Sequence, residues 1–144
     1  MTKQPRTVIL DNEAVEALAD IHHPKHTAAL ALLEVTNQRR SRKAELRLLV
    51  PTAVRVEAGW DRNDPAAAHV NRISRAADVI LNAAVANRCV RLRRLVPQAS
   101  VVDVTVAQAA ETSALQPVTI ITSDADDITS LAGHLAVPVV VAVI

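Results

Sequence analysis

Short apolar runs alternate with helical patterns of apolar residues along most of the chain. The first run, Val8–Leu10, ends at Asp11, and apolar residues at helical spacing follow it as far as Asp20. A buried strand of a parallel sheet has this continuous apolar character, because helices cover both of its faces. Strands and helices keep alternating further along, so the pattern predicts a mainly parallel sheet with helices on both faces.

The predicted elements follow the order β-α-α-β-α-α-β-α-β-α-β in one domain that spans residues 1–144. Strands are predicted at residues 8–10, 48–50, 90–95, 118–121 and 137–144. Helices are predicted at residues 12–20, 27–37, 51–60, 66–87, 100–115 and 127–133. The expected fold class is therefore α/β, with three layers in the order α/β/α and a central sheet of about five strands.

Composition narrows the classes of function. Half of the residues are hydrophobic and 22% are charged, which is typical of a globular protein. Trp60 is the only aromatic residue, so a platform of aromatic side chains for unpaired bases is excluded. The net charge is +1, so any basic surface for nucleic acid must be local. With Cys89 as the single cysteine, an internal disulfide and a cysteine-rich zinc site are excluded.

The lengths of the apolar runs predict the cellular location of the protein. No run reaches the roughly 20 residues that a membrane-spanning helix needs. The apolar run near the N-terminus is also too short for a signal peptide. We therefore expect a cytoplasmic protein that does not act at a membrane.

Acidic residues stand at or just beyond the ends of the predicted strands. Asp11 ends the first strand, Glu57 lies two turns into the helix after the second, and Asp103 begins an alanine-rich helix. Asp124 follows the fourth strand, and Asp127 comes one helical turn later. Ligands of such sheets bind beyond the carboxyl ends of the strands, so we expect these five side chains to meet.

A group of carboxylates at one place favours a metal site. Carboxylates held together repel one another, and their pKa values rise unless a cation neutralises them. Mg²⁺ prefers oxygen ligands, and one or two such ions promote attack of water on a phosphodiester. No glycine-rich turn surrounds a serine and no cysteine–histidine pair stands out, which excludes the common covalent nucleophiles.

Each acid also has a purely structural interpretation. Asp11, Asp124 and Asp127 stand near predicted helix starts, where a carboxylate caps the helix and interacts with its dipole. Asp103 completes the capping-box-like spacing Ser100-x-x-Asp103. Glu57 is equally compatible with an exposed position on its helix. The occurrence of all these acids in one α/β sheet is what favours the metal site.

Four segments, taken in order, resemble the PIN domain: VILDNEAVEALAD, PTAVRVEAGW, VVDVTVAQAAE and ITSDADDITSLA. Over nearly the whole chain, length and layout resemble the toxin ribonucleases of VapBC-type toxin–antitoxin systems. The resemblance implies an endoribonuclease that depends on Mg²⁺ or Mn²⁺ and acts on structured RNA such as tRNA or rRNA. It also implies a homodimer and a small antitoxin that wraps the toxin and blocks its site.

The resemblance implies roles for the five acids. The positions that match the family's catalytic residues are Asp11, Glu57, Asp103 and Asp124. Those that match its metal ligands are Asp11, Asp103, Asp124 and Asp127. A metal-bound water would then attack the phosphodiester.

Three polar residues are expected to orient the substrate or the acids. The family usually has Thr or Ser after its first aspartate, whereas this chain has Asn12, which still hydrogen-bonds a metal-bound water. The turn after the fourth strand keeps Thr122 and Ser123, which suit orienting Asp124 or binding phosphate.

Two basic stretches are candidates for contact with RNA phosphates, which give affinity without sequence information. The first contains Arg39, Arg40, Arg42 and Lys43, with Arg47 just beyond them. The second contains Arg91, Arg93 and Arg94. Solvated surface charge is the alternative for both, and the first stretch is also suited to an acidic tail of the antitoxin.

Other functions remain open. A PIN-like chain that has lost cleavage would act as a silent binding module through a protein or RNA partner. A phosphorylated receiver domain is disfavoured, because it needs a lysine after the last strand and none follows residue 137. The histidines His22, His23 and His26 suggest a transition-metal site only weakly, since no acids support them. The apolar first two helices suit either core packing or a docking surface for a partner.

Overall fold

The structure, a computed structural model, describes residues 5–41, 46–112 and 115–144, and the side chains of residues 36–41 are not described. Five parallel strands form one sheet in the order β3-β2-β1-β4-β5. The strands are β1 (Thr7–Leu10), β2 (Arg47–Pro51), β3 (Ala77–Val79), β4 (Val118–Thr122) and β5 (Val139–Val143).

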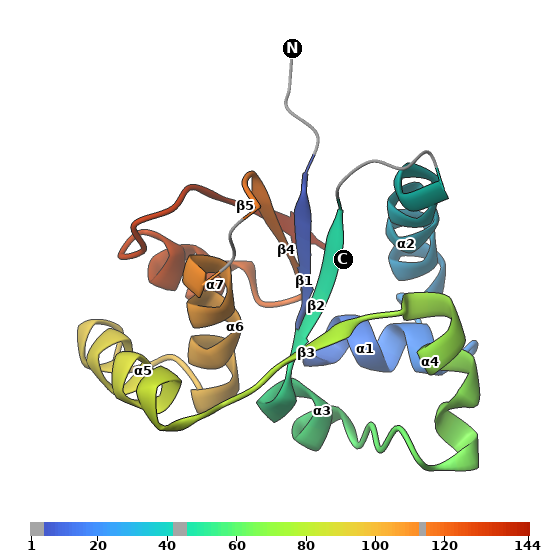
Figure 1. Cartoon of the computed structure of the whole chain (residues 1–144), viewed down its shortest axis with the longest axis horizontal. Coiled ribbons are helices and arrows are strands. Elements are labelled where there is room, and N and C mark those ends of the chain that lie inside the picture. The colour runs from blue at the N-terminus through green and yellow to red at the C-terminus, as the bar shows by residue number, and fades with distance from the viewer. Residues whose placement is uncertain (1–4, 42–45, 113–114) are drawn as a thin grey trace.

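The helices lie on both faces of this sheet. They are α1 (Asn12–Ala19), α2 (His26–Ser41), α3 (Thr52–Ala58), α4 (Ala68–Ser74), α5 (Ala83–Leu95), α6 (Val101–Thr112) and α7 (Ala125–Ala132), with a short 3₁₀ helix at Pro65–Ala67. Figure 1 shows α1, α2 and α4 on one side of the sheet, and α5, α6 and α7 on the other. This three-layer α/β/α arrangement confirms the predicted fold class. None of the described helices is both long and apolar enough to cross a lipid bilayer.

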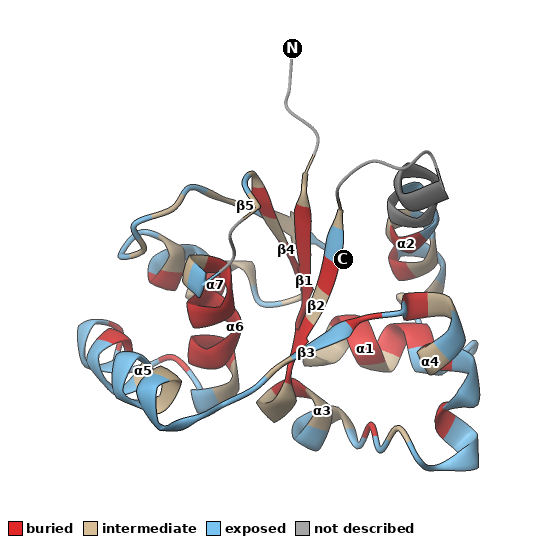
Figure 2. Cartoon of the chain, in the orientation of Figure 1, coloured by how far each residue is buried: buried red, intermediate tan, exposed pale blue. Residues whose placement is uncertain are grey.

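The central strand is β1, and its apolar run explains its place. All four of its residues are buried, and it pairs with β2 on one side and β4 on the other. Helix α6 covers it on one face with an unbroken buried stretch, residues 103–110, and Figure 2 shows both elements as mostly buried. Full burial of an Ile or Leu side chain stabilises a fold by about 1.5–3 kcal/mol, so this layer contributes much of the core.

The strand order indicates where a ligand would bind beside β1. From β1 the chain moves outward to β2 and β3, then returns to the other side of β1 to form β4 and β5. The direction of winding therefore reverses between β1 and β4. In an open parallel sheet the carboxyl ends of two such strands leave room for a ligand between the loops that follow them. Asp11 follows β1, and Asp124 follows β4.

The predicted long helix over residues 66–87 is wrong. Helix α4 ends at Ser74, and Arg75 takes the left-handed conformation with a φ of 49°. The next residues form β3, which pairs with β2, and Asn82 then caps α5 by accepting a hydrogen bond from the Val85 N–H. Pairing with β2 thus overrides the helical spacing of the apolar residues in this segment.

The predicted edge strand over residues 90–95 is wrong as well. These residues form the second half of α5. The alternation of apolar and basic residues is also compatible with helical spacing, because Cys89, Leu92 and Val96 pack against the core three or four residues apart. The true edge strands are β3 and β5, and β5 begins directly after Pro138, as expected for a proline at the edge of a sheet.

A cluster of charged side chains around the only tryptophan holds β3 in place. Arg55 Nη1 and Arg62 Nη2 each donate to a different oxygen of Asp78 at 2.9 Å. Both guanidinium groups also lie over the Trp60 ring, at 5.9 Å for Arg55 and 4.4 Å for Arg62. The Trp60 Nε1–H donates to Asn71 Oδ1 at 2.8 Å. Asp78, which falls within the helix predicted over residues 66–87, instead joins α3, the following loop and β3.

We expect Asp78→Asn to lower the free energy of unfolding by about 1 kcal/mol, the upper range for a partly exposed charge pair. Partial burial opposes ionisation, but the two guanidinium groups outweigh it and lower the pKa of Asp78. The stabilisation is therefore present above pH 4 and is lost as the pH falls through the lowered pKa. Urea denaturation at neutral and acidic pH measures it.

The exposed residue Glu34, which makes no described contact, supplies the control Glu34→Gln. It removes the same charge from helix α2, away from the β3 cluster. Equal destabilisation by both variants would contradict a specific role for Asp78.

Candidate metal centre

Asp11 links the end of β1 to the start of α1. Its side chain is only 1% exposed, and Oδ1 accepts from the Ala14 N–H at 3.2 Å, which caps the helix. Its Oδ2 accepts from the Thr122 hydroxyl. Burial raises the pKa of Asp11, and the hydrogen bonds from Thr122 and Ala14 counteract part of that rise. The capping interpretation and the position at the predicted site therefore both hold for this residue.

Thr122, at the end of β4, makes two hydrogen bonds with one hydroxyl group. It donates to Asp11 and accepts from the Asp124 N–H at 2.9 Å. The residue is completely buried. Thr122 was expected to orient either the substrate or Asp124. Its geometry fits the second role, because the hydroxyl is already engaged with two groups of the protein. Ser123 is half-buried, and none of its side-chain contacts is described.

Asp103 lies in the first turn of α6 and faces the same place. Its N–H donates to the Ser100 hydroxyl at 3.0 Å, so the predicted Ser100-x-x-Asp103 spacing does cap the helix. The side chain is 7% exposed. Burial raises the pKa of Asp103 to about 6; the Ser100 hydrogen bond opposes this, and the carboxylates of Asp124, Asp11 and Asp127 add to it.

Asp124 and Asp127 come from the start of α7. Asp124 caps this helix, with its Oδ1 accepting from the Asp127 N–H at 3.4 Å. Desolvation, together with the neighbouring Asp124 carboxylate, raises the pKa of Asp127. One carboxylate oxygen from each of Asp103, Asp124 and Asp127 lies within 4.8 Å of the others. The structure therefore brings three of the four predicted metal ligands together, with Asp11 close enough to act on the pKa of Asp103.

Glu57 lies at the rim of this group rather than within it. Its side chain is exposed on α3, and Oε1 accepts from Asn12 Nδ2 at 3.4 Å. Asn12 begins α1 directly after Asp11. The hydrogen bond thus joins the predicted substrate-orienting residue to the fourth predicted catalytic acid. The catalytic roles of these residues stay predictions.

The predicted phosphate contacts lie mostly beyond what the structure describes. Arg42 and Lys43 are outside the described residues. Arg39 and Arg40 belong to α2, but their side chains are not described. In the second basic stretch, Arg91, Arg93 and Arg94 are exposed on α5.

A second group of possible ligands, Glu13, Glu16 and His23, lies nearby on α1 and the following turn. Its polar atoms are already engaged with one another. His23 Nδ1 accepts from the Lys25 N–H at 3.0 Å, so its proton lies on Nε2, which faces Glu13 Oε1 at 3.5 Å. Lys25 Nζ also lies 3.7 Å from that oxygen. This arrangement leaves the imidazole no lone pair for a metal.

The two other histidines of that stretch do not complete a site. His26 Nδ1 donates to the Ala17 carbonyl at 2.7 Å, which ties the loop to α1. His22 is exposed, and its N–H donates to Asp20. The histidine-rich loop therefore has a structural explanation.

In the first two helices, most apolar residues of α1 are buried, whereas α2 leaves Val35 55% exposed.

The sequence matches no protein-family model, and no curated protein is significantly similar to it. The fold does have a solved counterpart. A chain in the crystal structure of VapBC2 from Rickettsia felis, bound to a DNA fragment from their promoter, superposes with a TM-score of 0.57. The alignment covers 94% of this chain and 98% of that chain, at 12% sequence identity. At this identity the likeness shows the fold alone, and it agrees with the PIN-like class expected from the sequence.

Sequence reasoning missed how the acids are held. The hydroxyl of Thr122, at the end of β4, donates to Asp11 at the end of the neighbouring strand β1. The two strands are far apart in the chain, so no local spacing reveals this contact. The signal that was available is the threonine at the end of an apolar run, two residues before an aspartate. That placement is typical of a side chain that accepts from a nearby backbone N–H.

We expect Thr122→Val to lower the free energy of unfolding by about 1–3 kcal/mol, because a buried carboxylate and a backbone N–H both lose a partner. Thr119→Val, on the same strand but without a described side-chain hydrogen bond, is the matched control. Thr122→Ser keeps the hydroxyl and should restore most of the loss. Chemical denaturation at neutral pH measures all three. An equal loss of stability in the two valine variants would contradict a stabilising role for the Thr122 hydroxyl.

We expect Asp103→Asn to stabilise the metal-free protein at pH 7.5 by about 1–2 kcal/mol, since a raised pKa means that the folded state disfavours the charge. The gain should shrink as the pH falls from 6 towards 4, where the carboxyl of the unaltered folded protein takes up its proton. Urea denaturation in EDTA at pH 7.5 and pH 4.5 measures whether Asp103→Asn raises or lowers the free energy of unfolding. Asp126→Asn is the control. If Asp103→Asn were less stable than the unaltered protein at pH 7.5, that result would contradict the raised pKa of Asp103.

Proposed function

We propose that the protein is an endoribonuclease that depends on Mg²⁺ or Mn²⁺, and that it is the toxin of a toxin–antitoxin pair. The carboxylates of Asp103, Asp124 and Asp127, held within 4.8 Å beside the buried Asp11, carry this proposal. Bringing such charges together opposes folding in the absence of a cation. A fold that keeps them beyond the carboxyl ends of its two central strands is suited to binding a cation there.

The donor set fits a hard divalent ion. All four side chains offer carboxylate oxygens, the ligands that Mg²⁺ and Mn²⁺ prefer. Asp103, Asp124 and Asp127 would hold the ion, with Asp11 contributing from the end of β1. A bound ion of this kind lowers the pKa of water and stabilises charge that develops on phosphodiester oxygens.

The chain's own residues supply position and proton transfer. Thr122 fixes Asp11 and the backbone of Asp124 relative to each other, so the acids are in place before substrate binds. Glu57, which Asn12 holds through Oε1, keeps Oε2 for accepting a proton from the attacking water. Ser123, which directly precedes Asp124 in the chain, would contact phosphate. RNA, of a structured kind such as tRNA or rRNA, is the proposed substrate.

Two protein partners belong to this proposal. The structural likeness to a chain of a VapBC complex supports a cognate antitoxin as one of them. A second copy of the chain is the other. Leu81, Val90 and Val101 line one pocket between α5 and α6, and each is at least 41% exposed, which gives an apolar surface for the second copy to bury.

We expect the purified protein to cleave RNA from a total RNA pool with Mg²⁺ or Mn²⁺ and not with EDTA. Asp11→Asn and Asp103→Asn should each lower the cleavage rate at least about a hundredfold, because each removes a charge from the metal-binding group. Gel analysis and sequencing of fragment ends measure the rate and the position of cleavage.

Asp126→Asn is the matched control. It removes an exposed carboxylate next to Asp127 without touching the proposed ligands, and its rate should stay within about twofold of the unaltered protein. Metal-independent cleavage, or equal rates for all variants, would refute the assignment. No cleavage combined with no binding of Mn²⁺ in a titration would favour the silent binding module.

A further inference from the structure

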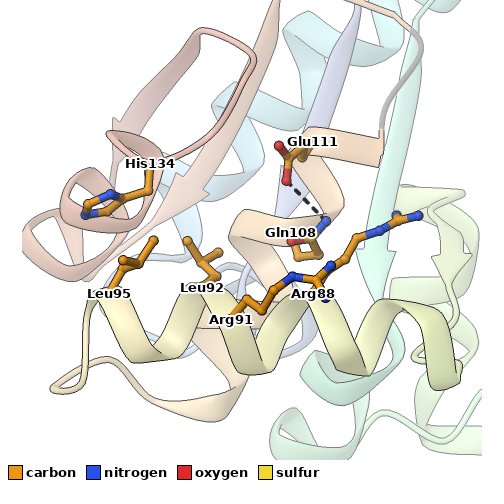
Figure 3. Close-up of a pocket in the computed structure, with 7 residues that line it drawn as sticks. All are labelled: Arg88, Arg91, Leu92, Leu95, Gln108, Glu111 and His134. Carbon is orange, nitrogen blue, oxygen red and sulfur yellow. Dashed lines mark hydrogen bonds between the residues drawn. The ribbon is translucent and has the colours of Figure 1, made fainter.

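A groove beside the C-terminal half of α6 has chemistry that the acidic site lacks. Its volume is about 380 Å³, and it lies between α5, α6 and the turn after α7 (Figure 3). Helix α5 contributes Arg88 and Arg91, α6 contributes Gln108 and Glu111, and His134 follows α7. Figure 3 shows both arginine side chains along the α5 wall of this groove, opposite Glu111.

The two arginines have no charged partner among the residues whose side chains are described. Glu111 is the acid that lines the groove, and both of its oxygens are occupied. Its Oε2 accepts from Gln108 Nε2 and its Oε1 from the Ala136 N–H, each at 3.3 Å. Arg55 and Arg62, by contrast, are both neutralised by Asp78. The guanidinium groups of Arg88 and Arg91 are therefore available to an anion from outside.

The spacing of the two arginines suits a chain of anions. They are one helical turn apart, so they lie on the same face of α5 with about 5–6 Å between their Cβ atoms. Helix α5 carries four arginines and no acid. A row of unpaired cations along one helix is the electrostatic footprint of a phosphate backbone.

The groove also lies within reach of the acidic group. Asp103 stands in the first turn of α6, and Glu111 follows eight residues later, which places it about 12 Å further along the helix. A strand whose phosphodiester reacts at the carboxylates would reach the groove after a few nucleotides. The carboxylates repel phosphate, so affinity for such a strand has to come from cations outside the acidic group.

We propose that the groove between α5 and α6 binds the phosphate backbone of an RNA strand, with Arg88 and Arg91 as its contacts. The choice of RNA rests on the proposed function, whereas the phosphate chemistry rests on the groove itself. Contacts of this kind fix the position of the strand and carry no base sequence. The near absence of aromatic residues agrees with this, because the groove offers no platform for stacking bases.

Equilibrium binding in EDTA tests the proposal without any cleavage. The probe is a short fluorescent single-stranded RNA of mixed sequence, followed by anisotropy over a series of salt concentrations. Arg88→Gln/Arg91→Gln should bind about tenfold more weakly at low salt. The slope of log affinity against log salt should fall by about 1.4, which corresponds to two lost phosphate contacts on a single strand.

Two further variants separate a specific groove from general charge. Arg72→Gln/Arg75→Gln removes the same charge from the other side of the sheet, where both arginines are exposed, and should bind within twofold of the unaltered protein. Arg88→Lys/Arg91→Lys keeps the charge and should keep the salt slope. All four arginines are exposed, so the variants should unfold at the same urea concentration as the unaltered protein.

Competition decides what the groove accepts. Unlabelled RNA should displace the probe at a far lower phosphate concentration than inorganic phosphate does; equal displacement would mean a site for single phosphate groups and would overturn the strand proposal. If binding of an oligoglutamate peptide depended on both arginines while binding of RNA did not, the groove would be assigned to an acidic polypeptide. Absence of RNA binding at low salt, or an unchanged slope in Arg88→Gln/Arg91→Gln, would also overturn it.

The outcome is separable from that of the cleavage test. Asp103→Asn should still bind the probe in EDTA, because its carboxylate only repels RNA. If the protein did not cleave RNA but its binding still depended on Arg88 and Arg91, the proposed nuclease activity would be refuted and the proposed RNA-binding groove would stand.

Discussion

The hydrogen bond from the Thr122 hydroxyl to Asp11 joins the two central strands at the edge where the acids gather. The same oxygen accepts from the Asp124 N–H, so one side chain sets the relative positions of acids more than a hundred residues apart in the chain. A buried carboxylate without partners would be costly, and two hydrogen bonds offset much of that cost for Asp11. The more exposed acids of α7 can then be placed beside it while remaining in contact with water.

The small net charge conceals a strong separation of charge within the molecule. Acids gather at the carboxyl ends of β1 and β4, whereas α5 is purely basic. Helix α6 lies between the two regions, with Asp103 at its start and Glu111 near its end. Glu111 accepts hydrogen bonds from Gln108 and a backbone N–H, and among the described side chains it forms no ion pair with the arginines opposite. A polyanion and a small cation can therefore be attracted to neighbouring parts of one surface.

Much of the fold follows from the sequence, and the misread parts have a common cause. The strands β1, β2 and β4 are each built around a short run of mostly apolar residues, which predicts a buried strand. In both segments, residues 77–79 and 90–95, the local apolar pattern fits a helix as well as a strand, so it does not decide which element forms. A three-residue strand forms only because β2 offers it a partner. That information lies in the tertiary structure and not in the local pattern.

The site was more predictable than the edges of the fold. Three acids that follow strand ends or begin helices do meet, because parallel strands bring their carboxyl ends to one side of the sheet. The sequence could not show that each carboxylate oxygen of Asp11 accepts a hydrogen bond, one from Ala14 and one from Thr122, or that Glu57 stays exposed at the rim. Those outcomes depend on side-chain directions that short motifs do not specify.

The cluster around Trp60 has a consequence for how the molecule behaves in a crowded solution. Strand β3 is an outer strand, and outer strands offer unpaired backbone groups to any extended chain that approaches. Here Arg62 Nη2 donates to the Ala76 carbonyl at 2.7 Å, directly before the strand, and Asp78 places a charge in its middle. The strand is also only three residues long. Charge and shortness thereby protect this edge of the sheet against self-association.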